Sequence, residues 1–197
     1  MTARIAVLAS GGGSNLQAVL NHFAALGPSA SGRVVLVASN RPDAKALERA
    51  HELGISARHF DHTDVSALLD LFDEFQVDLV VLAGYLKLIP AAITERYRGR
   101  MVNIHPGPLP AFGGAGMYGL KVHAAVLSAG AMETEVTVHF VDDRYDHGAV
   151  IARWPVPVRA DDTAESLAAR VLAVEHIVYP RIVDALSAII VNQRSSL

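Results

Sequence analysis

The alternation of short apolar runs with amphipathic segments in the first half of the chain is the feature that most constrains its fold. Short apolar runs recur at residues 5–10, 34–39, 55–60, 78–84 and 101–105. Segments with apolar residues at helical spacing lie between them, at residues 14–26, 43–53, 64–75 and 90–97. Because strands that are apolar on both sides occur where helices cover both faces of a parallel sheet, this order predicts an α/β fold.

The pattern changes after residue 130. Residues 134–141 alternate polar and apolar side chains, and residues 149–158 follow after a polar turn, which predicts an antiparallel strand pair. We therefore predict one domain over residues 1–197, with a Rossmann-like, mostly parallel sheet, helices on both faces and an antiparallel C-terminal strand pair.

A long helix is expected to close the chain over residues 161–188, with Asp162 or Thr163 as its N-cap. Proline lacks a backbone N–H, so Pro180 is expected to kink or break this helix. The tail over residues 191–197 is expected to fray.

Charge and composition restrict the class of protein. The 197 residues carry a formal net charge of −3 at pH 7 and include no cysteine. The lack of a basic excess argues against a nucleic-acid binder, and the lack of cysteine excludes disulfides and thiolate metal sites. The N-terminal apolar run is too short for a signal peptide, and no stretch approaches the roughly 18 apolar residues of a membrane span. We therefore expect a cytoplasmic protein with no nucleic-acid or membrane partner.

A glycine-rich loop, SGGGSNL at residues 10–16, joins the first predicted strand to the first predicted helix. Bare N–H groups at a helix N-terminus attract an anion, and Ser14 is the expected N-cap. The dinucleotide pattern would need glycine where this chain has Leu16, and the P-loop lysine is absent. The loop therefore indicates a site for a small phosphate monoester, or else only a tight turn that needs glycine.

Asn103 and His105 end the fifth predicted strand and are two positions apart, so that both side chains lie on one face. Three prolines at positions 106, 108 and 110 restrict the backbone that follows. An amide N–H beside an imidazole can stabilise a developing oxyanion while the imidazole moves protons. The alternative is a histidine that bonds only to backbone at a strand end.

The turn that follows the alternating strand offers three acids, Asp142, Asp143 and Asp146, any of which could favour the charged form of a histidine. The residues alone do not choose among them, and three acids in one turn could also bind a cation. His139 and His147 match no zinc spacing and are expected on the surface or on a sheet face.

Several stretches in this order resemble the phosphoribosylglycinamide formyltransferase family over about residues 3–187. They are SGGGSNLQA, VVLAGYLKLI, NIHPGPLP, VHFV-x-x-x-x-D-x-G-x-VI and EHIVYP. The resemblance implies transfer of a formyl group from the co-substrate 10-formyltetrahydrofolate to the amine of 5-phosphoribosylglycinamide (glycinamide ribonucleotide), in purine synthesis and with no metal. It leaves the oligomeric state open, a homodimer being one arrangement.

The resemblance also implies residue roles. The catalytic residues would be Asn103, His105 and Asp146, with Asp146 raising the pKa of a protonated His105. The N-terminal half would bind the phosphate through Gly13, Ser14 and Asn15. The C-terminal half would supply the catalytic turn and the folate side. Glu175 would hold the amine end of the substrate, and the folate contacts would be Leu86, Lys87, Leu88, Ile89 and Asp142.

Two departures from the family pattern bear on these roles. The stretch HPGPLP replaces the common HPSLLP, and Leu172 stands where the family often has glutamine. The Gly-rich stretch 112–123 resembles one branch of the family, so substrate contacts there do not transfer one by one. The alternatives are a formyltetrahydrofolate hydrolase, another formyl-folate-dependent formyltransferase such as the one that acts on methionyl-tRNA, and a non-catalytic phosphate- or folate-binding module.

Overall fold

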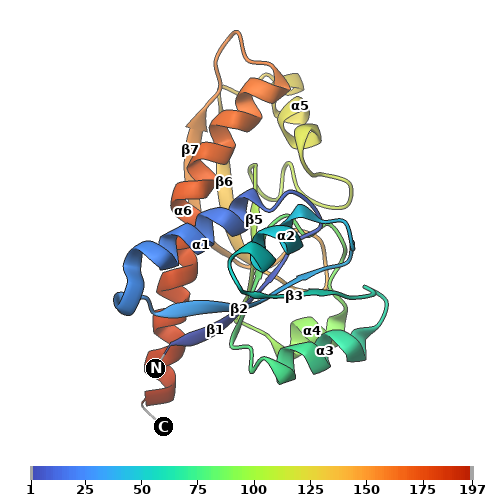
Figure 1. The fold of residues 1–197 in the computed structure, drawn as a ribbon. Helices are drawn as coiled ribbons and strands as arrows, with labels where there is room; N and C mark the ends of the chain where they lie inside the picture. The colour runs from blue at the N-terminus through green and yellow to red at the C-terminus, as the bar shows by residue number, and fades with distance from the viewer. Residues whose placement is uncertain (1, 196–197) are drawn as a thin grey trace.

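The computed structural model describes residues 2–195, and its strands form one seven-stranded sheet (Figure 1). The strands are β1 (Ala3–Leu8), β2 (Gly32–Ser39), β3 (Ser56–His59), β4 (Leu79–Leu82), β5 (Met101–His105), β6 (Glu133–Phe140) and β7 (Val150–Pro157). The helices are α1 (Ser14–Leu26), α2 (Lys45–Glu52), α3 (Val65–Glu74), α4 (Ala91–Arg96), α5 (Leu120–Ser128) and α6 (Ala164–Ser195), with a 3-10 turn, η1, at Gly27–Ser29.

The strand order is β3-β2-β1-β4-β5-β6-β7. The first five strands run parallel, whereas β6 pairs antiparallel with both β5 and β7. The predicted fold class is therefore confirmed, including the antiparallel pair. In such a sheet the loops that follow the parallel strands meet at one edge, where ligands of α/β proteins bind.

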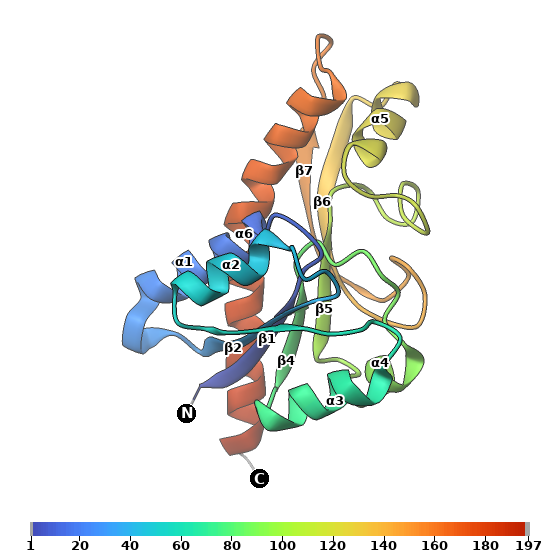
Figure 2. The same cartoon turned by 45° about the vertical axis from the view of Figure 1, so that its right-hand side comes forward.

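Helices cover both faces of the sheet (Figure 2). One buried apolar cluster joins α1, α2, α5 and α6 to one face, and a second joins α3 and α4 to the other. Successive residues of a strand point to opposite faces, so Ile5 and Val7 of β1 enter the first cluster while Ala6 and Leu8 enter the second. The apolar runs are continuous because both faces of these strands are buried.

The last helix, α6, is capped by one of the two predicted residues but is not broken at its proline. Its start is capped by Thr163, whose hydroxyl accepts from the N–H of Ser166 at 3.2 Å while the Ser166 hydroxyl accepts from the N–H of Thr163 at 3.0 Å. Of the two outcomes predicted for Pro180, a kink or a break, the break is wrong: the helix runs through Pro180, because the buried Tyr179 and Val183 pack this stretch against the sheet.

The predicted fraying of the C-terminal tail is also wrong as far as residue 195. Arg194 near the end of α6 donates to both carboxylate oxygens of the buried Asp78, to Oδ2 at 2.8 Å. The N–H of Arg4 donates to the same carboxylate at 2.9 Å. This ion pair fixes the end of the helix beside the beginnings of β1 and β4. Residues 196–197 of the predicted tail lie outside the described residues.

Two further elements differ from the expectation. Helix α5 was not predicted, because its sequence follows a glycine-rich stretch and has no clear starting signal. Ser14 is the first residue of α1 and not its N-cap. That place is taken by Gly13, whose φ of 70° lies in the left-handed region and which makes no side-chain cap.

Candidate active site

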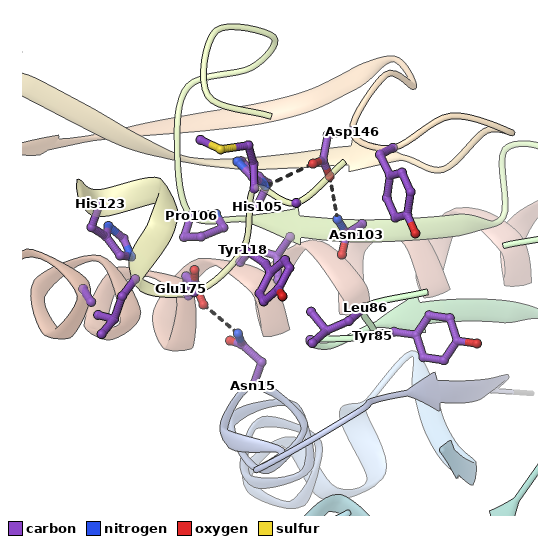
Figure 3. Close-up of a pocket in the computed structure, with 18 of the residues that line it drawn as sticks. Asn15, Tyr85, Leu86, Asn103, His105, Pro106, Tyr118, His123, Asp146 and Glu175 are labelled. Atoms are coloured by element: carbon purple, nitrogen blue, oxygen red, sulfur yellow. Dashed lines mark hydrogen bonds and ion pairs between the residues drawn. The ribbon is translucent and has the colours of Figure 1, made fainter. Parts of the chain in front are cut away.

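A cavity of about 510 Å³ opens at the carboxyl ends of the central strands (Figure 3). Its walls come from the beginning of α1, the loop after β4, the end of β5 and the loop that follows it, the turn between β6 and β7, and α5 and α6. The predicted site residues that line it are Asn15, Leu86, Asn103, His105, Asp146 and Glu175. Segments far apart in sequence thus meet at the sheet edge that the topology predicts.

Asn103 and His105 lie on the same face of β5, as their spacing predicts, and both border the cavity. The antiparallel register pairs Asn103 with His139 and His105 with Thr137 of β6. This pairing brings the side chain of His139 beside that of Asn103, which the sequence did not indicate.

Among the three candidate acids, only Asp146 borders the main cavity. Its φ of 53° places it in the left-handed region, which aspartate tolerates better than most residues. One carboxylate oxygen lies 3.4 Å from Asn103 Nδ2, and the other lies 3.5 Å from His105 Nδ1 and accepts from the N–H of Gly114 at 3.0 Å. Asp142 instead pairs with the exposed His147 at 2.7 Å and lines a smaller neighbouring cavity.

The tautomer of His105 follows from its partners. Nε2 lies 2.9 Å from the carbonyl oxygen of Phe112, and a carbonyl only accepts, so Nε2 carries a proton. In the neutral ring Nδ1 is therefore unprotonated and faces the Asp146 carboxylate.

The pKa of His105 lies below its ordinary value of 6.5, because burial lowers it more than Asp146 and the Phe112 carbonyl raise it. Asp146 acts in the expected direction, but the lowered pKa favours a neutral ring in the free protein, opposite to the expected cationic ring. The pKa of Asp146 is also lowered from 3.8: its burial is outweighed by its histidine neighbours and the Gly114 N–H, so this acid is ionised near neutral pH.

His139 is a site residue that the sequence analysis missed. Its side chain is buried, Nδ1 donates to the Phe140 carbonyl at 2.7 Å, and Nε2 therefore accepts from Asn103 Nδ2 at 3.1 Å. The Asn103 amide nitrogen is thus held between His139 and Asp146. Only the strand register could have identified His139, because its position in an alternating strand equally fits a sheet-face residue.

Glu175, on α6, is buried at 6% exposure and accepts from Asn15 Nδ2 at 2.6 Å (Figure 3). Burial raises its pKa from 4.5 to about 7, and the Asn15 hydrogen bond opposes this only in part. The other amide atom of Asn15, Oδ1, is buried without a partner. This pair joins the beginning of α1 to the cavity wall opposite Asp146.

The predicted phosphate loop lies between two cavities. Asn15 borders the main cavity, whereas Ser14 borders a second one of about 510 Å³ beside α1. Arg49 lines this second cavity and donates to the carbonyl oxygen of Gly12 at 2.8 Å, and the first turn of α1 contains no acid. A positive side chain and a helix N-terminus together favour an anion here.

The predicted folate segment is only partly in contact with the main cavity. Leu86 borders it, and Tyr85 and Tyr145 line the same end. Lys87 and Leu88 are exposed, and Ile89 is buried in the core beneath α3 and α4. None of these three borders the cavity, so their contact with folate stays a prediction.

Metal-binding groups of side chains and membrane-spanning helices are both absent from residues 2–195. No group of three or more histidine, aspartate or glutamate side chains in that range is placed to hold a metal ion. No described helix is long and apolar enough to cross a membrane. The chemistry that the described groups offer is hydrogen bonding to an oxyanion and proton transfer at a histidine beside an ionised acid.

The known proteins that this chain resembles include formyltransferases. A family model described as formyl transferase matches residues 3–183. The chloroplastic phosphoribosylglycinamide formyltransferase of Arabidopsis thaliana is 44% identical over 191 residues, which are 93% of this chain and 65% of that protein. The phosphoribosylglycinamide formyltransferase of Escherichia coli strain K12 is 39% identical over 187 residues, or 91% of this chain and 85% of that protein.

A solved structure of phosphoribosylglycinamide formyltransferase from Anaplasma phagocytophilum has a TM-score of 0.85 and 35% identity, and the match covers 95% of this chain and 88% of that one. The chain spans less than two thirds of the length of its plant relatives. The resemblance given by the motifs is confirmed. Because the family model matches most of the sequence, the chain belongs to the formyl transferase family.

Proposed function

We propose that this protein transfers the formyl group of 10-formyltetrahydrofolate to the amine of 5-phosphoribosylglycinamide, as part of purine synthesis. The observation that carries the proposal is that Asn103, His105 and Asp146 meet at one cavity. The printed names of relatives that match over nine tenths of this chain support it.

The reaction uses the two ends of the cavity. The pteridine of the folate enters between Tyr85, Leu86 and Tyr145, where flat apolar side chains suit a flat ring. The glycinamide end lies toward Asn15 and Glu175, and the phosphate lies at the beginning of α1, near Arg49. The two substrates meet in front of His105.

The amine nitrogen adds to the formyl carbon, and the carbonyl electron pair moves to the formyl oxygen. Asn103 Nδ2 donates to this oxygen after releasing the longer of its two contacts, the one to Asp146 at 3.4 Å. Nδ1 of His105 accepts the proton that the amine nitrogen loses, and Asp146 stabilises the resulting imidazolium. The bond to N10 of the folate then breaks, and the same proton passes to N10.

A lowered pKa of His105 suits this order of reaction steps, because the imidazole is neutral at the start of the reaction and neutral again at its end. It differs from the expected mechanism, in which a protonated ring donates from the outset. Attack is direct, so no covalent enzyme intermediate forms.

A formyl-transfer assay with glycinamide ribonucleotide and 10-formyltetrahydrofolate tests the proposal. Formylated ribonucleotide should appear in amounts equal to the tetrahydrofolate released. Tetrahydrofolate released without formylated amine would identify a hydrolase, and binding without turnover would identify a non-catalytic module. Either result would refute the transferase.

Substitution of the three central residues tests their roles. Asn103→Ala, His105→Ala and Asp146→Ala should each lower kcat by about 10²–10³, the usual cost of removing an oxyanion donor or a proton-transfer group. Far-UV circular dichroism should stay unchanged. A variant that keeps the wild-type kcat would remove that residue from the mechanism.

We further propose a cytoplasmic location, which the lack of cysteine supports and which cell fractionation would test. The relatives from plants are named chloroplastic, so recovery in an organelle fraction is the contrary result. That the protein forms a homodimer stays a prediction, and the molar mass measured by light scattering would test it.

A further inference from the structure

The short segment Phe112–Gly114 contacts both members of the proposed proton-transfer pair through its backbone. The Phe112 carbonyl accepts from His105 Nε2 at 2.9 Å, and the Gly114 N–H donates to Asp146 Oδ2 at 3.0 Å. The same carboxylate oxygen lies 3.5 Å from His105 Nδ1. Three consecutive residues thus hold the imidazole at one nitrogen and the acid that faces its other nitrogen.

Gly113, between these two contacts, has no room for a side chain. A Cβ built there would overlap Leu109 Cδ2 and would lie 3.0 Å from Asp146 Cβ. Leu109 Cδ2 is the end of a flexible side chain, but Asp146 Cβ is fixed by a backbone in the left-handed region. An added methyl group would therefore push Asp146 away from His105, or push the segment away from both.

We propose that Gly113 is a positioning residue, and that the segment Phe112–Gly114 fixes His105 as the Nε2–H tautomer with Nδ1 facing Asp146. The inference rests on the proposed function, because it concerns the pair that would carry the proton. It assigns a role to the glycine-rich stretch 112–123, for which the family resemblance implies no individual substrate contacts. It also predicts that the histidine tautomer is set before a substrate binds.

The groups that face His105 determine in which direction its pKa should change when Gly113 is replaced. Asp146 and the Phe112 carbonyl raise its pKa, whereas His139 on β6 lowers it, and His105 and His123 on α5 also disfavour each other's charge. A single methyl group displaces the segment by only a fraction of an ångström, so the ring stays buried and the two histidines stay in place, while the two contacts that raise the pKa weaken. The pKa of His105 should therefore fall further.

Nitrogen NMR of the histidine rings tests the proposal without substrate. His105 is assigned by comparison with His105→Gln. In the wild-type protein the neutral ring should be a single Nε2–H tautomer, and in Gly113→Ala its pKa should be lower. A wild-type ring that is Nδ1–H, or that exchanges between tautomers, would overturn the proposal whether or not the protein is a transferase.

Kinetics supply the second readout. Gly113→Ala should lower kcat about 10–100-fold, as misplacement by a fraction of an ångström commonly does, with both KM values within about threefold of wild type. Ala111→Ser, which adds one atom at the exposed neighbour of the segment, is the matched control and should leave kcat unchanged. A loss of kcat in Gly113→Ala with an unaltered His105 pKa would mean that the pair is not involved.

A double variant separates the two contacts of the added methyl group and covers the case in which Gly113→Ala does not fold. Leu109→Ala removes the overlapping Cδ2, so Gly113→Ala/Leu109→Ala is compared with Leu109→Ala alone. The double variant should remain impaired in kcat and in the His105 pKa, because the contact with Asp146 persists. Full recovery to the level of Leu109→Ala would show that crowding of Leu109 was the cause, and would overturn the proposal.

Discussion

In the proposed reaction Asn103 must present its amide nitrogen, and not its amide oxygen, as the hydrogen-bond donor. One histidine, His139, sets this orientation. His139 Nε2 accepts from Asn103 Nδ2 at 3.1 Å, and its Nδ1 is committed to the Phe140 carbonyl at 2.7 Å. With both ring nitrogens engaged, the orientation of the amide is fixed before substrate arrives. A fixed donor costs no reorganisation when charge develops.

Replacing His139 should therefore impair turnover more than binding. His139→Ala should lower kcat about 10–100-fold with KM values little changed, because the Asn103 amide is then held only by its longer contact, to Asp146 at 3.4 Å. His139→Gln, whose amide oxygen can accept from Asn103, should recover part of the loss. Steady-state kinetics measure both, and a wild-type kcat in His139→Ala would exclude the positioning role.

Glu175 should make the stability of the protein depend on pH. In the unfolded chain the Glu175 carboxyl group loses its proton near its ordinary pKa of 4.5, whereas in the folded protein its pKa is raised to about 7. Below pH 4.5 the residue is protonated in both states and its contribution to stability is fully present. As the pH rises toward 7 the contribution is lost, because only the unfolded state has released the proton.

Urea unfolding of wild type and Glu175→Gln at pH 5 and pH 8 measures this effect. The variant should gain about 2–3 kcal/mol relative to wild type between these two pH values, which is the cost of a buried carboxylate with so raised a pKa. Groups common to both proteins cancel in the comparison. A difference that stays constant with pH would show that Glu175 ionises normally in the folded protein.

The sequence predicts the parts of the site that depend on local spacing. Asn103 and His105 share a face because they are two apart on a strand, and the glycine loop follows β1 as expected. The sequence does not predict His139, whose role depends on the register of β6 against β5. Spacing alone also leaves Asp142, Asp143 and Asp146 equivalent, because only the path of the turn brings one of them to the cavity, and it was the family resemblance that singled out Asp146.

At the scale of elements, the end of α6 depends on an ion pair that links residues 116 positions apart. Asp78 is buried, and removing Arg194 would leave its carboxylate with the N–H of Arg4 and no cation. Arg194→Met should lower the free energy of unfolding by about 1–2 kcal/mol, a modest value because the arginine is itself half exposed.

Arg181 offers a matched control on the same helix, because it is exposed and has no hydrogen bond or ion pair among residues 2–195. Arg181→Met should change the free energy of unfolding by less than about 0.5 kcal/mol. Urea unfolding at one pH compares the two variants. Equal effects would mean that the Asp78–Arg194 pair does not stabilise the protein.

The same pair explains an error of sequence reasoning about elements. The apolar and alternating runs predict every strand and all helices but α5, since residues buried in the core leave a local signal in the sequence. The polar C-terminal segment predicts fraying, because its own sequence has no strong apolar pattern. It is nevertheless helical, since Arg194 pairs with Asp78, a residue far away in the sequence. Pro180 misleads for a related reason, because tertiary packing on both sides keeps the helix continuous.

At the scale of the whole molecule, α6 packs against elements from both halves of the chain. It contacts α1, β1 and β2 from the first half and α5, β6 and β7 from the second. We therefore expect residues 1–197 to unfold as a single domain, since neither half keeps its core without this helix.

Two spectroscopic probes test this expectation. Trp154, the single tryptophan, lies on β7 and reports on the second half, whereas far-UV circular dichroism reports on all helices. The two urea transitions should coincide in a single step. A fluorescence change at lower urea than the circular dichroism change would show that the second half unfolds by itself.

Asp78 gathers both ends of the described chain at the edge of the sheet where the strands begin, since it binds Arg4 of β1 and Arg194 of α6. The main cavity opens at the other edge, where the strands finish. A neighbouring protein or a solid support attached through either terminus would therefore lie on the side of the sheet away from the main cavity, and the cavity would stay open to small molecules.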